Sequence, residues 1–219
     1  MLLDLVFPRR CVVCGGPAEE LCAGCRARLR RIVAPCCARC GAPAAWPVER
    51  CRECAGRRIA FASARAAVAY DEPARRLVGA WKERGLRTLV TLSADLIAET
   101  VARPRAYTIS FVPADENRRL RRGHNPAERL AEELGLRWQL PVVPLLARAA
   151  GVRPQRGLPL DERRRNVQGV FRATARSPAT LVLVDDVYTS GATVSAAASA
   201  LRKAGARRVE VVTFARAVR

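Results

Sequence analysis

The stretch LVLVDDVYTSGAT, residues 181–193, decides the fold of this chain and holds its main candidate site. Its first four residues are apolar, as expected of a short buried strand. Two carboxylates, Asp185 and Asp186, follow them, and a turn of small residues then leads into a helix-forming run, residues 194–204. Ligands of open parallel sheets bind beyond the carboxyl ends of the strands. The order of strand, acid pair, turn and helix therefore predicts a ligand site here.

The turn itself is suited to a phosphate group. Backbone N–H groups at the start of a helix are unpaired, and the helix dipole attracts anions to them. Hydroxyls add donors, and Gly191 lets the backbone approach a ligand closely. Two neighbouring acids need compensation, which sugar hydroxyls or a magnesium ion would supply. The alternative is an ordinary strand–helix turn with solvated acids, but the order of all four parts favours the phosphate site.

This pattern resembles the phosphoribosyl-pyrophosphate signature of the type I phosphoribosyltransferases. The resemblance implies that Asp185 and Asp186 face the ribose hydroxyls and act in catalysis. It also implies that the 5′-phosphate is held by the segment that follows them, namely Thr189, Ser190, Gly191, Ala192 and Thr193.

The composition of the chain is strongly basic, with 39 Lys+Arg against 20 Asp+Glu and a net charge of +19. Such a charge fits a polyanionic partner such as nucleic acid. Only Lys82 and Lys203 are lysines, so a compositional bias towards arginine explains the charge equally well. No apolar run is long enough to span a bilayer, and residues 1–8 lack a signal-peptide pattern, so we expect a cytoplasmic protein without membrane insertion.

Cysteines are confined to the first quarter of the chain, where all nine lie before residue 55. Eight of them form four C-x-x-C pairs, and Cys36 is left over. Four thiolates in tetrahedral array are the usual structural zinc site, and a chain without a signal peptide favours metal over disulfides. The simplest assignment is sequential, with one site of Cys11, Cys14, Cys22 and Cys25 and a second of Cys37, Cys40, Cys51 and Cys54.

Several alternatives remain open for this segment. The pairs could interleave, one site could be vacant, and Cys36 could replace Cys37. An iron–sulfur cluster is a weaker option than one or two zinc ions. The segment is either a purely structural clip or a ribbon that touches nucleic acid or protein. We expect it to form a zinc-binding module over residues 1–58, followed by a second domain over residues 59–219.

The remainder of the chain alternates between strand and helix patterns. The expected strands are residues 66–70, 107–113, 142–146, 181–184 and 209–213. The expected helices are residues 72–84, 88–101, 125–134 (ended by Gly135) and 194–204. This alternation predicts an α/β fold with a mostly parallel sheet and helices on both of its faces.

Two arginine-rich segments could add to the phosphate site. In residues 111–134 a strand leads into a basic loop that ends in Arg122-Gly123-His124-Asn125, and Pro126 then opens a helix that Asn125 can cap. This loop is either a second anion site or a solvated basic loop. Residues 154–171 are either a mobile flap over a bound phosphate or an exposed basic helix.

Taken together, the motifs resemble one family over nearly the full chain. FPRRC, the cysteine pairs, WKERG, RRLRRGHN, ERRRNVQGVF and LVDDVYTSGAT occur in the order typical of the ComF family, which are phosphoribosyltransferase-like proteins linked to competence and DNA uptake. The resemblance implies a zinc module fused to a type I phosphoribosyltransferase fold. It also implies a cytoplasmic protein that acts on incoming single-stranded DNA beside a helicase-like partner.

The same resemblance assigns the arginine-rich segments. Arg122, Gly123 and Asn125 match the pyrophosphate loop, with Arg122 as a catalytic group, while Gln155 and Arg163 belong to the flexible loop. Family members commonly have phenylalanine where His124 stands, and often Lys-Tyr where this chain has Lys82-Glu83.

Two functions follow from this reading. The first is a phosphoribosyltransferase that binds phosphoribosyl pyrophosphate with magnesium; its acceptor cannot be named from the sequence. The second is a protein without turnover that senses phosphoribosyl pyrophosphate or a nucleotide, and holds single-stranded DNA on its zinc module and basic surface.

Overall fold

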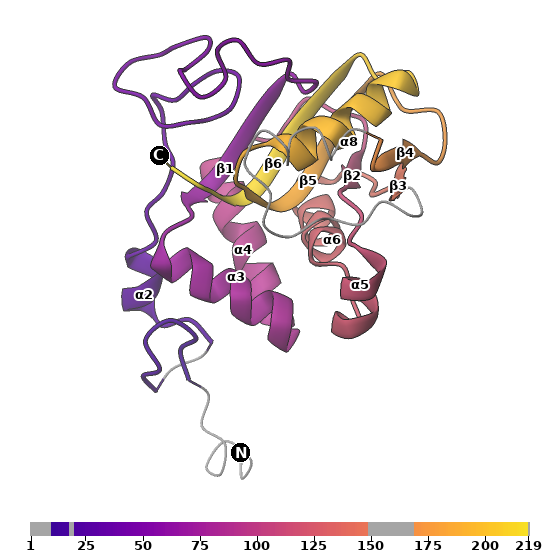
Figure 1. Ribbon diagram of the computed structural model, residues 1–219. Helices are drawn as coiled ribbons and strands as arrows, with labels where there is room; N and C mark the ends of the chain where they lie inside the picture. Colours follow the sequence, from indigo (N-terminus) through magenta and orange to yellow (C-terminus); the bar gives the residue numbers. More distant parts are fainter. Residues whose placement is uncertain (1–9, 18–19, 149–168, 219) are drawn as a thin grey trace.

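A four-stranded parallel sheet forms the centre of the molecule in the computed structural model, which describes residues 10–17, 20–148 and 169–218 (Figure 1). The strand order is β1-β6-β5-β2, and all three neighbouring pairs run parallel. The expected α/β fold with a parallel sheet is therefore confirmed. The bounds are Ser63–Ala69 for β1, Ile109–Phe111 for β2, Thr180–Tyr188 for β5 and Arg208–Arg216 for β6.

Strand β5 shows why the sheet is covered on both faces. Its side chains alternate, so Leu181 and Leu183 pack in one core while Val182 and Val184 pack in the other. Three helices cover the valine side and one covers the leucine side (Figure 1). The first three are α3 (Glu72–Arg84), α4 (Arg87–Thr100) and α6 (Pro126–Trp138), and the fourth is α8 (Ala192–Lys203).

Part of the cysteine-rich segment belongs to the core on the leucine side. Cys37, Cys40 and Cys54 are buried together with Phe61 and Leu183. The earlier part of the segment contains one short helix, α2 (Ala23–Ala27), and lies beside α3 and α4 (Figure 1). The second group of cysteines is thus built into the body of the protein.

The structure corrects the strand expected at residues 142–146. Val142 only bridges Ile109, and the next strand, β3 (Leu146–Arg148), pairs antiparallel with β4 (Phe171–Ala173) in a separate two-stranded sheet. The reason is the pair of prolines at positions 141 and 144. Neither has an N–H group to donate to a ladder, so the chain cannot continue the central sheet there.

Two further elements differ from expectation. The basic loop before Gly123 contains a helix, α5 (Glu116–Arg122), because its Glu, Arg and Leu residues are good helix formers. Gly123 ends this helix in the left-handed conformation, at φ 71°. Strand β5 is longer than expected and continues to Tyr188. Asp185 and Asp186 therefore lie within the carboxyl-terminal half of the strand rather than after its end.

Helix α6 runs past the glycine expected to end it. It continues through Gly135 to Trp138, and Gln139 forms its left-handed cap. A Cβ at Gly135 would lie 2.7 Å from Val142 Cγ2 and 3.0 Å from the Leu140 carbonyl oxygen. Gly135 therefore allows close packing of the helix against the chain that follows it.

The flexible-loop residues Gln155 and Arg163 lie outside the residues that the structure describes, and so do residues 1–8. Among the described helices, none combines the length and apolar character needed to span a bilayer.

The packing of Gly135 generates a prediction with a matched control. Gly135→Ala should destabilise the protein by about 1–3 kcal/mol, because Val142 and the backbone would have to move. Gly79→Ala in α3 should stabilise it by about 0.5–1 kcal/mol, because nothing lies within 4 Å of a Cβ there and alanine favours a helix. Urea unfolding of both variants tests this; an equal effect of the two substitutions would contradict the packing role of Gly135.

Candidate functional site: a phosphate loop, an acid pair and two tetracysteine sites

The loop between β5 and α8 presents unpaired backbone donors. The N–H groups of Thr189, Ser190 and Gly191 donate no hydrogen bond to any other residue that the structure describes. Gly191 caps α8 at φ 73°, and a Cβ there would lie 2.2 Å from the Tyr188 hydroxyl oxygen. Glycine is required both by this backbone conformation and by the ring beneath it. The loop has the form of an anion site at a helix start.

The predicted acid pair lies immediately before this loop and is partly neutralised. Asp186 Oδ2 lies 2.6 Å from Lys82 Nζ, and the two side chains are only 17% and 22% exposed. Asp185 Oδ1 accepts a hydrogen bond of 2.9 Å from the Asp186 N–H. Burial and the adjacent Asp186 raise the pKa of Asp185 to about 8, against the opposing effect of Lys82. A ligand that brings hydroxyl donors or a cation would stabilise the ionised form of these two carboxylates.

Helix α3 connects the acid pair with the predicted pyrophosphate loop. Lys82 contacts Asp186, and the next residue, Glu83, forms an ion pair with Arg122. Arg122 is 14% exposed, and its Nε atom and His124 Nε2 are buried without a partner among the described residues. Neither Lys82 nor Glu83 was predicted as a site residue. The only sequence signal was the departure from the family pattern at this position.

Asn125 is held within the chain. Its side-chain oxygen accepts from the Ala127 N–H at 3.2 Å and its nitrogen donates to the Val112 carbonyl at 3.2 Å. The expected capping of α6 is thus confirmed, whereas a phosphate contact by Asn125 stays a prediction. Ala192 and Thr193 form the first turn of α8 and are partly buried.

Eight cysteines form two groups that fit tetrahedral zinc. Within each group all ligand atoms lie within 4.8 Å of one another. Four sulfurs at about 2.3 Å from one zinc ion would be about 3.8 Å apart. The observed Sγ–Sγ distances include 3.9 Å for Cys14–Cys22 and 3.6 Å for Cys37–Cys54. The groups are Cys11, Cys14, Cys22, Cys25 and Cys37, Cys40, Cys51, Cys54, so the sequential assignment is confirmed.

Backbone donors support the thiolates of these sites. The Cys25 N–H donates to Cys22 Sγ at 3.4 Å, and the Cys51 N–H donates to Cys37 Sγ at 3.2 Å. Burial opposes ionisation of Cys37, but the backbone amides of Cys40, Cys51 and Arg39 outweigh it and lower the pKa of its thiol to about 6. Cys36 belongs to neither group. The second site therefore uses Cys37, and the alternative with Cys36 is excluded.

Known proteins are similar both to the cysteine-rich segment and to nearly the whole chain. Residues 2–55 match the double zinc ribbon domain family. The chain is 27% identical to competence protein F of Haemophilus influenzae over 96% of its own length and 98% of that protein. It is 28% identical to the DNA utilization protein YhgH of Salmonella typhimurium, covering 94% and 96% of the two chains. For competence protein ComFC of Bacillus subtilis the values are 24%, 86% and 80%.

The resemblance to the ComF family is confirmed. Among solved structures, the chain is similar to orotate phosphoribosyltransferase from Aeropyrum pernix, with a TM-score of 0.38 and 21% identity over 68% of this chain and 67% of that one. It is also similar to glutamine phosphoribosylpyrophosphate amidotransferase from B. subtilis, with a TM-score of 0.39 and 20% identity over 58% of this chain and a quarter (25%) of that one.

The two sites predict the metal content of the protein. Purified wild type should contain about two zinc ions per chain, since each site offers four sulfurs. Cys51→Ser should lower this to about one, whereas Cys36→Ser should leave it unchanged because Cys36 lies outside both groups. Mass-spectrometric metal analysis of the folded variants decides this, and an equal loss in both would refute the assignment.

Proposed function

We propose that this protein binds phosphoribosyl pyrophosphate together with magnesium at the β5–α8 loop. The observation that carries the proposal is the set of three unpaired amides, at Thr189, Ser190 and Gly191, next to the acid pair. Amides at a helix start suit the 5′-phosphate, and paired carboxylates suit the ribose hydroxyls.

Each motif then has a distinct task. The loop from Thr189 to Thr193 would hold the 5′-phosphate, while Asp185 and Asp186 would orient the ribose and stabilise positive charge that develops on it. Arg122 and Gly123 would face the pyrophosphate, with Gln155 and Arg163 as additional contacts. Magnesium would supply charge neutralisation of the pyrophosphate group. These residues act by positioning and electrostatic stabilisation, as expected for a phosphoribosyltransferase.

A cellular role follows from the relatives. The names of the related proteins refer to competence and to DNA utilization. We infer that this protein also acts in the handling of DNA, in the cytoplasm and beside a helicase-like partner. Phosphoribosyl pyrophosphate would be its substrate or, without turnover, its signal.

Ligand binding can be tested with a charge-matched control. Magnesium and phosphoribosyl pyrophosphate should stabilise the wild type by about 2.7 kcal/mol at 100 times the dissociation constant. Asp185→Asn/Asp186→Asn should abolish this stabilisation, while Glu72→Gln/Glu132→Gln, which removes two exposed carboxylates elsewhere, should retain it. Thermal unfolding and calorimetric titration provide the measurement. Absence of any effect of the ligand on the wild type would refute the proposal.

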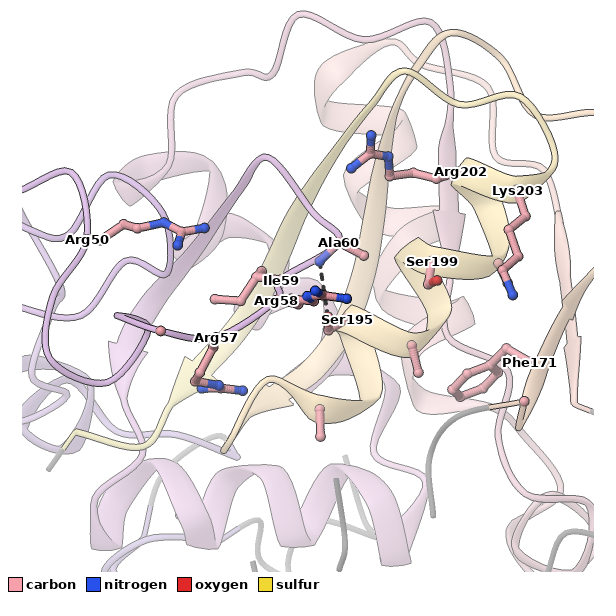
Figure 2. Close-up of a pocket in the computed structure, with 15 residues that line it drawn as sticks. Arg50, Arg57, Arg58, Ile59, Ala60, Phe171, Ser195, Ser199, Arg202 and Lys203 are labelled. Atoms are coloured by element: carbon pink, nitrogen blue, oxygen red, sulfur yellow. Dashed lines mark hydrogen bonds between the residues drawn. The ribbon is translucent and has the colours of Figure 1, made fainter. Parts of the chain in front are cut away.

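A second candidate function is favoured by a basic groove along α8 (Figure 2). The groove has a volume of about 940 Å³ and runs between α8, the linker after the second cysteine site and β4. No acidic residue lines it among the described residues. Its walls carry five cationic side chains and two serines, namely Arg50, Arg57, Arg58, Arg202, Lys203, Ser195 and Ser199.

This groove has the chemistry of a binding surface for single-stranded nucleic acid. Arginine and lysine neutralise phosphates and release counterions, which gives affinity without regard to sequence. Phe171 is the one aromatic residue among its described lining residues, so base stacking contributes little. The groove therefore fits the phosphate backbone of single-stranded DNA more than its bases.

The nucleic-acid role is testable through its salt dependence. Arg202→Ala/Lys203→Ala should weaken binding of single-stranded oligonucleotides and reduce the slope of log K against log salt by about one per lost phosphate contact. Arg75→Ala/Arg103→Ala removes the same charge outside the groove and should have a smaller effect. Fluorescence anisotropy at several salt concentrations measures both. Equal losses in the two variants would assign the binding to net charge alone.

A further inference from the structure

Two arginine side chains join the second cysteine site (Cys37, Cys40, Cys51 and Cys54) to the loop between β5 and α8, residues 189–191, which is called the phosphate loop below. Arg57, three residues after Cys54, donates from Nη2 to the Ser190 carbonyl oxygen at 2.7 Å and from Nη1 to the Glu53 carbonyl oxygen at 3.2 Å. It therefore bridges the turn that holds the cysteine ligand and the loop that offers the free amides. In Figure 2, the side chains of Arg57 and its exposed neighbour Arg58 leave the linker in different directions.

The second arginine makes a parallel connection at the end of β6. The Arg216 side chain is 1% exposed. Its Nη1 donates to the Cys40 carbonyl oxygen, and its Nη2 donates to Glu53 Oε2 at 2.7 Å. The guanidinium lies over the Tyr188 ring at 4.8 Å from the centroid. This ring is the surface against which Gly191 packs.

The Arg57 contact fixes the orientation of one peptide in the loop. A trans peptide is planar, so its carbonyl and N–H groups point in opposite directions. Because Arg57 holds the Ser190 carbonyl, the Gly191 N–H is directed to the side away from Arg57. Without that contact the peptide before a glycine can rotate, since glycine accepts both signs of φ. A rotated peptide would present a carbonyl oxygen, which repels phosphate.

Zinc at the second cysteine site would fix the other end of both connections. Glu53 lies between the ligands Cys51 and Cys54, and residues 51–62 contain no helix or strand of their own. Metal ligation is therefore the main constraint on the backbone that carries Glu53 and Arg57. The four sulfurs of this site fit zinc, as their mutual distances show.

We propose that Arg57 and Arg216 are positioning residues for the phosphate loop, and that the second zinc site acts through them to hold the loop in its phosphate-binding conformation. This inference rests on the proposed binding of phosphoribosyl pyrophosphate. It assigns the second site a role in ligand affinity that the first site does not share. The first site packs instead beside α3 and α4, where Arg76 of α3 donates to the Val13 carbonyl at 2.6 Å.

The first test compares charge-matched variants of the full chain. Arg57→Ala should weaken binding of magnesium phosphoribosyl pyrophosphate about tenfold, and Arg57→Lys, which keeps one donor, should recover most of the affinity. Arg52→Ala is the control, because Arg52 is exposed in the same turn and bonds to no described residue. All three variants should keep two zinc ions, which separates loop positioning from loss of the module.

A ligand-free readout keeps this inference distinct from the proposed function. Amide hydrogen exchange across residues 187–194 should be faster in Arg57→Ala than in the wild type or Arg52→Ala. If the wild type does not bind phosphoribosyl pyrophosphate, the proposed function fails, and unchanged exchange would show separately that Arg57 does not hold the loop. Binding by the wild type with equal affinity in Arg57→Ala would overturn the inference alone.

The second test uses the reciprocity of linked binding. If zinc at the second site favours phosphoribosyl pyrophosphate, then that ligand must raise zinc affinity by the same factor. Competition with a colorimetric chelator should therefore show tighter retention of one of the two zinc ions when magnesium phosphoribosyl pyrophosphate is present. Arg57→Ala under identical conditions should lose this protection, which also corrects for zinc binding by the ligand itself. Equal protection in the two proteins would contradict the proposed connection.

Discussion

The buried guanidinium of Arg216 is the interaction on which the junction of the two parts of the chain depends. A buried charge is tolerated only when it is paired and its donors are satisfied. Arg216 meets this condition with one carboxylate, two carbonyls and one aromatic face. Glu53 and the Cys40 carbonyl come from the cysteine-rich segment, the Ala217 carbonyl follows β6, and the Tyr188 ring belongs to β5. Removing one partner of such a pair typically costs about 3–5 kcal/mol. The zinc-binding segment and the sheet are consequently interdependent: the cysteines shape the partners of Arg216, and Arg216 closes the core above Tyr188.

Local features of the sequence predicted most of the helices and strands, but they could not predict contacts between segments that are distant along the chain. The apolar run of β5 and the alternation of strand and helix patterns predicted the parallel sheet, and the cysteine spacing predicted both metal sites. Glycine often stops a helix, so the sequence predicts a helix end at Gly135, whereas close packing against Val142 is the actual constraint there. Arg57 and Lys82 were missed because their partners lie more than 100 positions away along the chain. No spacing rule identifies one functional arginine in a chain so rich in that residue.

The arginines of this chain fall into groups with different surroundings in the structure. Some arginines form structural ion pairs: Arg137 of α6 binds Asp95 of α4 and Glu133 of its own helix, and Arg31 binds Glu99. Others line the groove along α8 without any acidic neighbour among its described lining residues. Paired charges contribute little to an external field, since their partners cancel them at short range. The ion-paired arginines therefore add little to an attraction for nucleic acid, whereas the cationic side chains of the groove are not cancelled by acidic residues among its described lining.

The phosphate loop is supported from two sides, and the supports differ in kind. On the α3 side, Lys82 and Glu83 contact Asp186 and Arg122, which are groups that a ligand would itself engage. These ion pairs are partly exposed and must be rearranged when hydroxyls or a pyrophosphate arrive, so they balance charge in the free protein. On the zinc side, Arg57 holds a carbonyl that no anion would bind. That contact can persist in the bound state. Under the proposed function, a site with exchangeable ion pairs on one side and a fixed backbone support on the other would release its ligand without losing its shape.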